Sequence, residues 1–513
     1  MSEAQERTMF EAQEKHDISP LPSRERGGHS SRNLLPPLLP LASAVTAFWL
    51  LSGCTVGPDY RKPDTPVAAE FGNTIATNAE PQREFWQAFN DPTLDRLVSD
   101  ALAANHDVRI AIANLREARA VRREVGGQGL PSVGAYADGN REIIAQTLEP
   151  GTRAQRTTDI FDAGLDASWE LDFFGRYRRA AEAADASVSA AEASVADVQV
   201  SVIAEVARNY FELRGAQRQL AVAQDAVVNQ QANLDYVEAR LSGGRGTELD
   251  TARARSQVAS TRAGVPVLEA QIARSSYRLA VLTGRPPTEL SVLLGEPKPL
   301  PALAPVAGIG TPEALLRRRP DIRIAERQLA ASNAQIGVYT ADLFPQVTIN
   351  GLLGLNAGTI GALGQASAFV YNIGASATWT PFDFGQRRAR VTQAESRADA
   401  ALARYQKTVL TALEETEAAL VTFNRTQRQA DSLFDAARHS EQAEKIARVR
   451  FENGATDFLT VLDAERQVLI DQDGLARAQT AAGTSLIAIY KALGAGWPVS
   501  TTVTTVTTVT SAR

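Results

Sequence analysis

The sequence contains a single cysteine, Cys54, and only four histidines among its 513 residues. One cysteine cannot form a disulfide within a chain and cannot build a cysteine-based zinc site. The histidines (His16, His29, His106 and His439) stand alone, and no His-Glu-x-x-His motif of the metalloproteases occurs. No lysine follows a glycine, so the chain has no Gly-Lys-Ser/Thr loop for binding phosphate. These absences argue against an enzyme and against a protein that powers transport with nucleotides.

The sequence also lacks a large excess of either charge. The chain has 59 acidic and 53 basic residues, so its net charge is only -6. This balance gives no reason to expect nucleic acid as a partner. Aromatic residues supply only 6% of the chain. The length is sufficient for two or three domains, and their arrangement has to be read from patterns along the sequence.

The only long apolar run lies at residues 34–51, where three prolines interrupt it and basic residues precede it. This order resembles a secretory signal, and the prolines disfavour a permanent spanning helix. The run ends in Leu-Ser-Gly-Cys at 51–54, which resembles the lipobox of bacterial lipoproteins. We therefore expect 1–53 to be a leader and Cys54 to carry a covalent lipid, as an S-diacylglycerol and an N-acyl group. The alternative is a buried free cysteine after an ordinary anchor helix.

The chain is internally duplicated, a feature to be sought before any detail. Residues 106–111 match 320–325 at an offset of 214, and from Trp169 and Trp379 onward the offset is 210. The four-residue change fits a longer surface loop in the first copy. We predict a lipid-anchored segment at 54–93, a first repeat at 94–300, a second repeat at 301–497 and a disordered Thr/Val-rich tail at 498–513.

Each repeat is predicted to begin with a helix, at about 94–126 and 312–342, followed by two strands, a very long helix and a shorter one. Residues 176–241 contain no proline and only one glycine, Gly215, and residues 386–453 contain neither. Such segments would form rods of about 100 Å at 1.5 Å per residue. Helices of this length are normally coiled or bundled. On the helices alone, a solvated coiled-coil stalk without a pore fits as well as a channel.

The strands favour a channel. Apolar and polar residues alternate over 161–171 and again over 369–379, and partner strands follow Pro131 and Pro345. Strands of this length with one apolar and one polar face are typical of a membrane-spanning barrel. Four strands cannot close such a barrel, eight from a dimer would leave its interior filled, and twelve from a trimer leave a lumen. A soluble sheet with one buried face is the alternative. Aromatic residues that fit a membrane-interface belt gather where strand gives way to helix: Trp169, Phe173, Phe174, Trp379, Phe382 and Phe384.

These pieces together resemble the TolC-like outer-membrane factor family, in its lipoprotein branch of OprM- and NodT-type proteins. The matching segments are 54–60 (CTVGPDY), 168–176 (SWELDFFGR), 316–322 (LRRRPDI) and 451–459 (FENGATDFL). The resemblance implies an α+β membrane protein, a homotrimer whose twelve strands form one transmembrane β-barrel, continued by a helical barrel across the periplasm. It also implies an outer-membrane location and no cofactor other than the lipid.

Two turns at the far ends of the long helices are candidate contact sites. In each, glycine ends the first helix, while Thr247 and Thr456 are candidate caps of the next. Similar turns in the family meet the tips of a periplasmic adaptor. The resemblance carries that role to Gly244, Arg245, Gly246, Thr247, Leu249, Gly454, Ala455, Thr456, Phe458 and Leu459.

Leu459 and Asp463 are four residues apart and share one helix face. In similar channels the matching positions line the closed periplasmic mouth as rings. Three Asp463 carboxylates near a threefold axis would repel one another, favour cations and bind a divalent ion. The alternative is a local pair between Asp463 and Arg466.

The sequence thus predicts a passive exit duct that receives small molecules from an inner-membrane pump, of the RND type by resemblance, through the adaptor. A type I protein-secretion duct and a non-conducting stalk are the alternatives.

Overall fold

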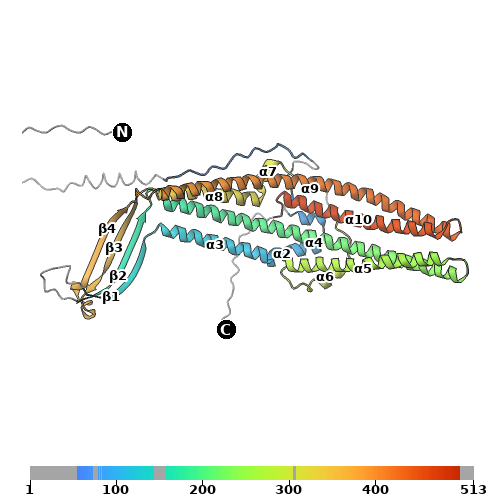
Figure 1. Ribbon diagram of the computed structural model, residues 1–513, viewed down its shortest axis with the longest axis horizontal. Helices are drawn as coiled ribbons and strands as arrows, with labels where there is room; N and C mark the ends of the chain where they lie inside the picture. Colours follow the sequence, from blue (N-terminus) through green and yellow to red (C-terminus); the bar gives the residue numbers. More distant parts are fainter. Residues whose placement is uncertain are drawn as a thin grey trace, which may run out of the picture. The chain divides into compact units, whose positions relative to one another are not determined.

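Two very long helices dominate the computed structural model, which describes residues 55–72, 79, 81–82, 84–143, 157–303 and 308–496. Helices α4 (Arg176–Ser242) and α9 (Gln386–Glu452) have 67 residues each. Each turns back into a helix of 35 residues, α5 (Glu248–Leu282) after α4 and α10 (Phe458–Ala492) after α9. The predicted pair of helical hairpins is therefore confirmed (Figure 1).

The opening helix of each repeat is broken, contrary to the prediction of one continuous helix. The first consists of α2 (Pro92–Ala104) and α3 (His106–Gln128), and the second of α7 (Pro312–Arg318) and α8 (Pro320–Ala341). Asn105 leaves helical geometry and its side chain accepts bonds from two backbone N–H groups of α3. Arg319 is extended because it precedes a proline. The two breaks occupy matching positions of the duplicated sequence.

The four strands form one antiparallel sheet in the order β1-β2-β3-β4, as Figure 1 shows. They are β1 (Ser132–Ile143), β2 (Thr157–Leu171), β3 (Gln346–Ala357) and β4 (Phe369–Thr378). All four follow the sequence prediction. The edges of β1 and β4 have no partner strand within the described part of the chain.

The helices pack beside one another in an order that also follows the duplication. Helix α4 contacts α3, α5, α8 and α10, whereas α9 contacts α8 and α10. The remaining described elements are short: η1 (Phe85–Phe89), α6 (Ser291–Gly295), η2 (Ile360–Ala362) and η3 (Ala366–Ala368). Among the residues described, no helix combines the length and the apolar character needed to cross a membrane.

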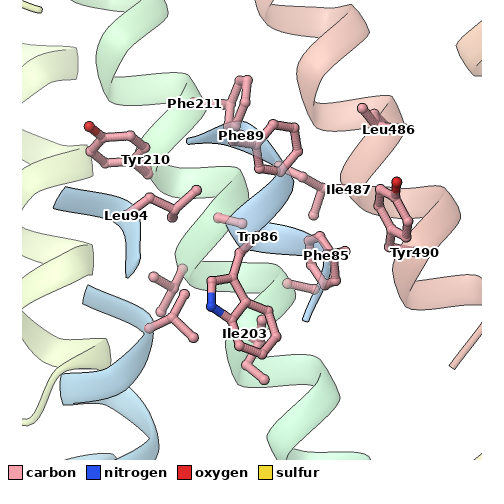
Figure 2. Packing of buried hydrophobic residues seen from close by; sticks show 14 of the residues in the cluster. Phe85, Trp86, Phe89, Leu94, Ile203, Tyr210, Phe211, Leu486, Ile487 and Tyr490 are labelled. Carbon is pink, nitrogen blue, oxygen red and sulfur yellow. The ribbon is translucent and has the colours of Figure 1, made fainter. Parts of the chain in front are cut away.

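The main apolar core lies where η1 packs between α4 and α10 (Figure 2). Phe85 is fully buried and stacks on Tyr490 with 4.7 Å between ring centroids, while Phe89 meets Phe211 edge to face at 5.0 Å. Aromatic pairs of this kind contribute roughly 0.5–1.5 kcal/mol beyond the area they bury. Residues from both repeats and from the segment before the first repeat therefore share one core.

Gly215, the one glycine in α4, marks a close crossing of helices. A Cβ at this position would lie 2.1 Å from the hydroxyl oxygen of Thr480 on α10. Helices approach this closely only where one of them lacks a side chain. The glycine noted in the sequence therefore sets the distance between the two hairpins.

Candidate channel surfaces and hairpin tips

The two faces of the sheet differ in chemistry, as the alternating sequence predicts. Leu165, Leu353 and Tyr371 lie side by side on one face of β2, β3 and β4, and all three are exposed. Two rows further, Trp169 lies opposite Ile349 on the same face. A contiguous apolar surface of this kind favours an apolar environment, because its exposure to water costs free energy. At the loop end of the first hairpin an Arg141–Asp159 ion pair of 2.6 Å limits this apolar band.

The opposite face carries a ladder of polar side chains. Ser168 donates to Asn350 Oδ1 over 3.1 Å, and Asn350 Nδ2 donates to Ser376 Oγ over 3.3 Å. Nearer the loops, Asn356 Nδ2 donates to Asp162 Oδ1 over 2.5 Å. These groups satisfy one another across three strands and leave further acceptors for water. The sheet is therefore suited to lipid on one side and water on the other.

The two tryptophans make the same bond in the two repeats. Trp169 Nε1 donates to the carbonyl of Gly129 over 3.1 Å, and Trp379 Nε1 donates to that of Leu343 over 3.0 Å. Both carbonyls lie at the junction from helix to strand. Each ring is thereby fixed at the edge of the apolar band with its polar atom toward the helices, as an interface residue requires.

The phenylalanines of the predicted belt are placed differently. Phe174 stacks on Phe344 with 4.5 Å between centroids, and Phe173 is half-buried. Phe382 and Phe384 are fully exposed, and Phe384 has a φ of 53°, which is strained for a residue with a side chain. Phe173 and Phe174 therefore pack within the chain, whereas Phe382 and Phe384 are exposed to solvent.

The segment after Cys54 begins at this same junction. Val56 N donates to the carbonyl of Phe174 over 3.1 Å, and Arg179 donates to the carbonyls of Val56 and Gly57. The segment continues along the helices, where Tyr60 donates to Glu326 over 2.6 Å. Burial, reinforced by the Glu326 carboxylate, raises the pKa of Tyr60. Cys54 itself lies outside the described residues.

Both hairpin turns close with the same backbone motif. Gly244 and Gly454 have φ values of 70° and 76°, and the next residue in each turn donates back to a carbonyl of the preceding helix (Arg245 N to Arg240 O and Ala455 N to Arg450 O, both 2.8 Å). Glycine at this position avoids the strain of a left-handed residue.

The helix caps at the turns only partly follow the prediction. Thr247 caps α5 by accepting from Asp250 N over 3.1 Å. The prediction of Thr456 as the second cap is wrong, because Asp457 occupies that position and accepts from Thr460 N. Asp457 matches Thr247 at the offset of 210, so the repeat itself identifies the cap.

The two tips pack against each other through Leu234 and Val237 of α4, Val258 of α5 and Phe458 of α10, among others. Phe458 is only 4% exposed and packs on Phe451 with 5.3 Å between centroids. Gly244, Arg245, Thr247, Leu249, Gly454, Ala455 and Leu459 are exposed, while Gly246 and Thr456 are half-buried. Phe458 therefore supports the tips, and the other predicted residues form their surface.

Leu459 and Asp463 both face solvent on α10 within the single chain. Asp463 Oδ1 accepts from Arg466 Nη2 over 3.1 Å, so the local pair considered as an alternative is present. Exposed pairs of this kind stabilise a helix by a few tenths of a kcal/mol at most.

A buried charged cluster that the sequence analysis did not single out lies behind the tips. Glu465 of α10 is 7% exposed and accepts bonds from Asn233 of α4 and from Arg448 of α9, the latter at 3.1 Å. Its second oxygen is buried without a hydrogen-bond partner in the described part of the chain. Burial raises the pKa of Glu465 to about 7 against the opposing attraction of Arg448.

The duplication contains a signal for the pairing of Arg448 with Glu465, although not for the burial of Glu465. At the offset of 210, Arg448 and Glu465 correspond to Glu238 and Arg255, which form an exposed ion pair of 2.7 Å. The charges of the two pairs are reversed.

A cavity of about 370 Å³ beside the buried pair is lined by Asp225, Gln230, Glu441, Lys445 and Gln472, among others. No group of histidine, cysteine or acidic side chains among the described residues is arranged to hold a metal ion.

Comparison with known proteins gives the family. The sequence profile of the family described as "Outer membrane efflux protein" matches residues 97–285 and 311–495. The chain belongs to the outer membrane efflux protein family.

Known relatives of this outer membrane efflux protein cover nearly all of its length. It is 31% identical to nodulation protein T of Rhizobium leguminosarum bv. trifolii over 87% of this chain and 96% of that protein. It is also 31% identical to the solvent efflux pump outer membrane protein SrpC of Pseudomonas putida, over 88% and 98%. The solved outer-membrane channel OprN superposes with a TM-score of 0.82 at 43% identity, covering 86% of this chain and all of OprN.

The protein is therefore an outer-membrane efflux channel subunit, and its fold is the helical and β-stranded fold of such channels. The predicted family, fold class, function and location are confirmed. The family and SrpC are named for efflux, in agreement with the expectation of a duct rather than an enzyme.

We expect the packing of the tips in this efflux protein to weaken as pH rises. The pKa of Glu465 is about 7 in the folded chain against an ordinary 4.5, so the stability it contributes is present below pH 4.5 and is lost as pH rises through 7. The change is on the order of 2–3 kcal/mol. Hydrogen exchange of the amides around Glu465, corrected for intrinsic rates, should be faster at pH 8 than at pH 5.

Glu465→Gln should make this local exchange independent of pH. Glu238→Gln, which alters the carboxylate of the exposed Glu238–Arg255 pair, is the matched control and should behave as the unmodified protein. The assignment fails if Glu465→Gln retains the full pH dependence.

Proposed function

We propose that three copies of the chain close their sheets into one twelve-stranded barrel through the outer membrane, continued by the helices as a periplasmic tunnel. The observation that carries this proposal is a sheet with an apolar face, a polar face and two edges that no other described strand pairs with. Lipid offers no hydrogen bonds to open strand edges, so the sheet has to close on itself. Twelve strands leave a lumen, whereas eight leave an interior filled by side chains.

The lumen serves as a passive exit. Small molecules reach it from an inner-membrane pump through a periplasmic adaptor, and the chain itself supplies neither energy nor catalysis. SrpC is the outer membrane protein of an efflux pump, which favours this function over a protein-secretion duct or a stalk. The solvents that SrpC exports are substrates of that protein.

We also propose that Cys54 carries the covalent lipid. Val56 is hydrogen-bonded to Phe174, next to the tryptophan-bearing end of the sheet, so an acyl chain two residues earlier would start at the level of the membrane interface. Mass spectrometry of the mature N-terminal peptide should find a triacylated cysteine. A mature protein beginning at any other residue would exclude this anchor.

The exposed tip residues are the proposed contacts of the adaptor. Leu249 and Leu459 are large apolar side chains exposed at the ends of rigid helices, and Arg245 adds a charged group beside them. We expect photo-crosslinkers at Leu249 and Leu459 to capture the adaptor in cells. A crosslinker at Val292 on α6, which is also exposed, should not capture it.

Asp463 is proposed to form, with Leu459, the ring at the closed periplasmic mouth. Purified protein should conduct in planar bilayers, and Asp463→Ala should raise the single-channel conductance several-fold and weaken block by divalent cations. The reason is that three carboxylates near one axis hold cations in the constriction.

Arg466→Ala separates the ring from the local ion pair. It removes the same pair but keeps the carboxylates, so it should not raise the conductance. Equal effects of the two substitutions would show that only the pair matters. A protein that does not conduct at all would support the stalk.

A further inference from the structure

The cavity beside Glu465 lies between the two helical hairpins. Its walls come from α4 of the first hairpin and from α9 and α10 of the second. Arg448 is already paired with Glu444 and Glu465, and Lys445 is exposed, so water screens its charge. The cavity therefore has an excess of negative charge. Its charged lining consists of four carboxylates and two cations: Asp225, Glu441, Glu444, Glu465, Lys445 and Arg448.

Two buried oxygens at one end of this cavity lack a donor. Glu465 and Gln230 are only 7% and 4% exposed. Glu465 Oε2 and Gln230 Oε1 have no hydrogen-bond partner in the part of the chain that the structure describes. Gln230 lies one turn before Asn233 on α4, and Asn233 donates to the other oxygen of Glu465. An ammonium group at this end of the cavity would supply the missing donors and the opposite charge.

The other end of the cavity is also acidic. Asp225 lies about 7–8 Å along α4 from Gln230, and its side chain is exposed. Glu441 of α9 accepts from Gln472 of α10 over 2.6 Å. Gln472 lies about 10 Å along α10 from Glu465. The cavity is therefore elongated, with carboxylates at both ends.

The wall between the two ends is apolar and includes Val468 and Leu469 of α10. We propose that the cavity binds an elongated organic dication, a diamine or polyamine with an ammonium group at each end. One ammonium group donates to Glu465 and Gln230, and the other lies beside Asp225. The methylene groups between them cover the apolar wall. The ligand contacts both hairpins and so holds them together behind the tips.

Calorimetric titration of the purified full-length protein with 1,8-diaminooctane tests this proposal. Binding should saturate at one ligand per chain. The matched ligand 8-amino-1-octanol, in which a hydroxyl replaces one ammonium group, should bind roughly tenfold or more weakly. The shorter 1,4-diaminobutane should also bind more weakly, because it cannot reach both ends of the cavity.

The affinity for the diamine should rise between pH 5 and pH 8. Burial raises the pKa of Glu465, and a bound ammonium group favours the ionised carboxylate, so binding releases a proton to solvent. The charged groups that face Glu465 are Arg448 and Glu444 of α9, whereas α4 presents the neutral Asn233 and Gln230. Glu465→Gln should weaken binding and remove most of its pH dependence.

Asp225→Asn tests the opposite end without altering a buried group, and it should weaken binding roughly tenfold. Asp435→Asn is the matched control, because Asp435 is the counterpart of Asp225 at the offset of 210 and pairs with Arg438 on the surface. It should leave the affinity unchanged.

Three results overturn the proposal: no saturable binding of the diamine, equal affinities for the diamine and the amino alcohol, or an affinity that neither Glu465→Gln nor Asp225→Asn changes. The proposed exit duct is tested separately by conductance. A protein that conducts but does not bind the diamine therefore overturns the cavity proposal alone.

Discussion

Leu353→Arg is expected to prevent stable insertion of the protein into the outer membrane. Leu353 lies in the central row of the apolar face, opposite Leu165 and Tyr371, and is exposed. A charged side chain at such a depth costs roughly 2–4 kcal/mol per strand. Three copies in one barrel raise the cost to about 6–12 kcal/mol. Membrane fractionation of cells should find most of the variant unassembled or degraded.

Leu352→Arg is the matched control, because the same substitution falls one residue earlier on the opposite face. Leu352 lies opposite Asp166 and Asn372, so an arginine there meets polar groups. This variant should assemble normally and change only the conductance of the channel. If both variants insert equally well, the assignment of the two faces to lipid and water is wrong.

Arg319→Ala should lower the free energy of unfolding by about 2–4 kcal/mol. The buried guanidinium of Arg319 donates to Asp321 (2.6 Å), to Glu415 (2.7 Å) and to the carbonyl of Ala492 (3.0 Å). It also opposes the rise in the pKa of Asp197, which burial produces. Removing it takes this donor away from Asp321 of α8, Glu415 of α9 and the carbonyl of Ala492 of α10. The melting temperature of the detergent-purified protein measures the effect.

Arg317→Ala is the control, because Arg317 belongs to the same run of arginines but its side chain is exposed. Its partner Glu313 is one turn away, and both side chains are exposed, so the stability should change by less than about 0.5 kcal/mol. Arg319→Lys should recover little, since a single ammonium cannot reproduce the forked contacts to two carboxylates. Similar melting temperatures for all three variants would rule out the structural role of Arg319.

The elements of the fold could be predicted because each depends on a local pattern. The long helices follow from residues 176–241 and 386–453, where glycine and proline are nearly absent, and the strands follow from alternation that was visible in both copies. The breaks at Asn105 and Arg319 were missed, although Pro320 disfavours helical geometry at Arg319. No proline marks the break at Asn105. Contacts with the ends of α5 and α10 stabilise both turns, because Asn105 donates to Leu282 O and Arg319 to Ala492 O.

The candidate site could be predicted only in part from the sequence. Turns with glycine define their own geometry, so Gly244 and Gly454 were placed correctly. The cap Asp457 was overlooked in favour of its neighbour, although alignment to Thr247 identifies it. The buried state of Glu465 could not be predicted, because it depends on three helices from two repeats meeting at one level. Sequence periodicity describes one helix at a time.

The segment after Cys54 has a consequence for the order of assembly. It is held by Arg179 of α4, then by Asn333 and Glu326 of α8, and finally by Glu417 of α9, which accepts from Gly72 N. Its docking groove therefore exists only after both halves of the chain have been synthesised and packed. Residues 55–72 leave the ribosome before the helices that hold them, and their docking joins the two halves of the chain.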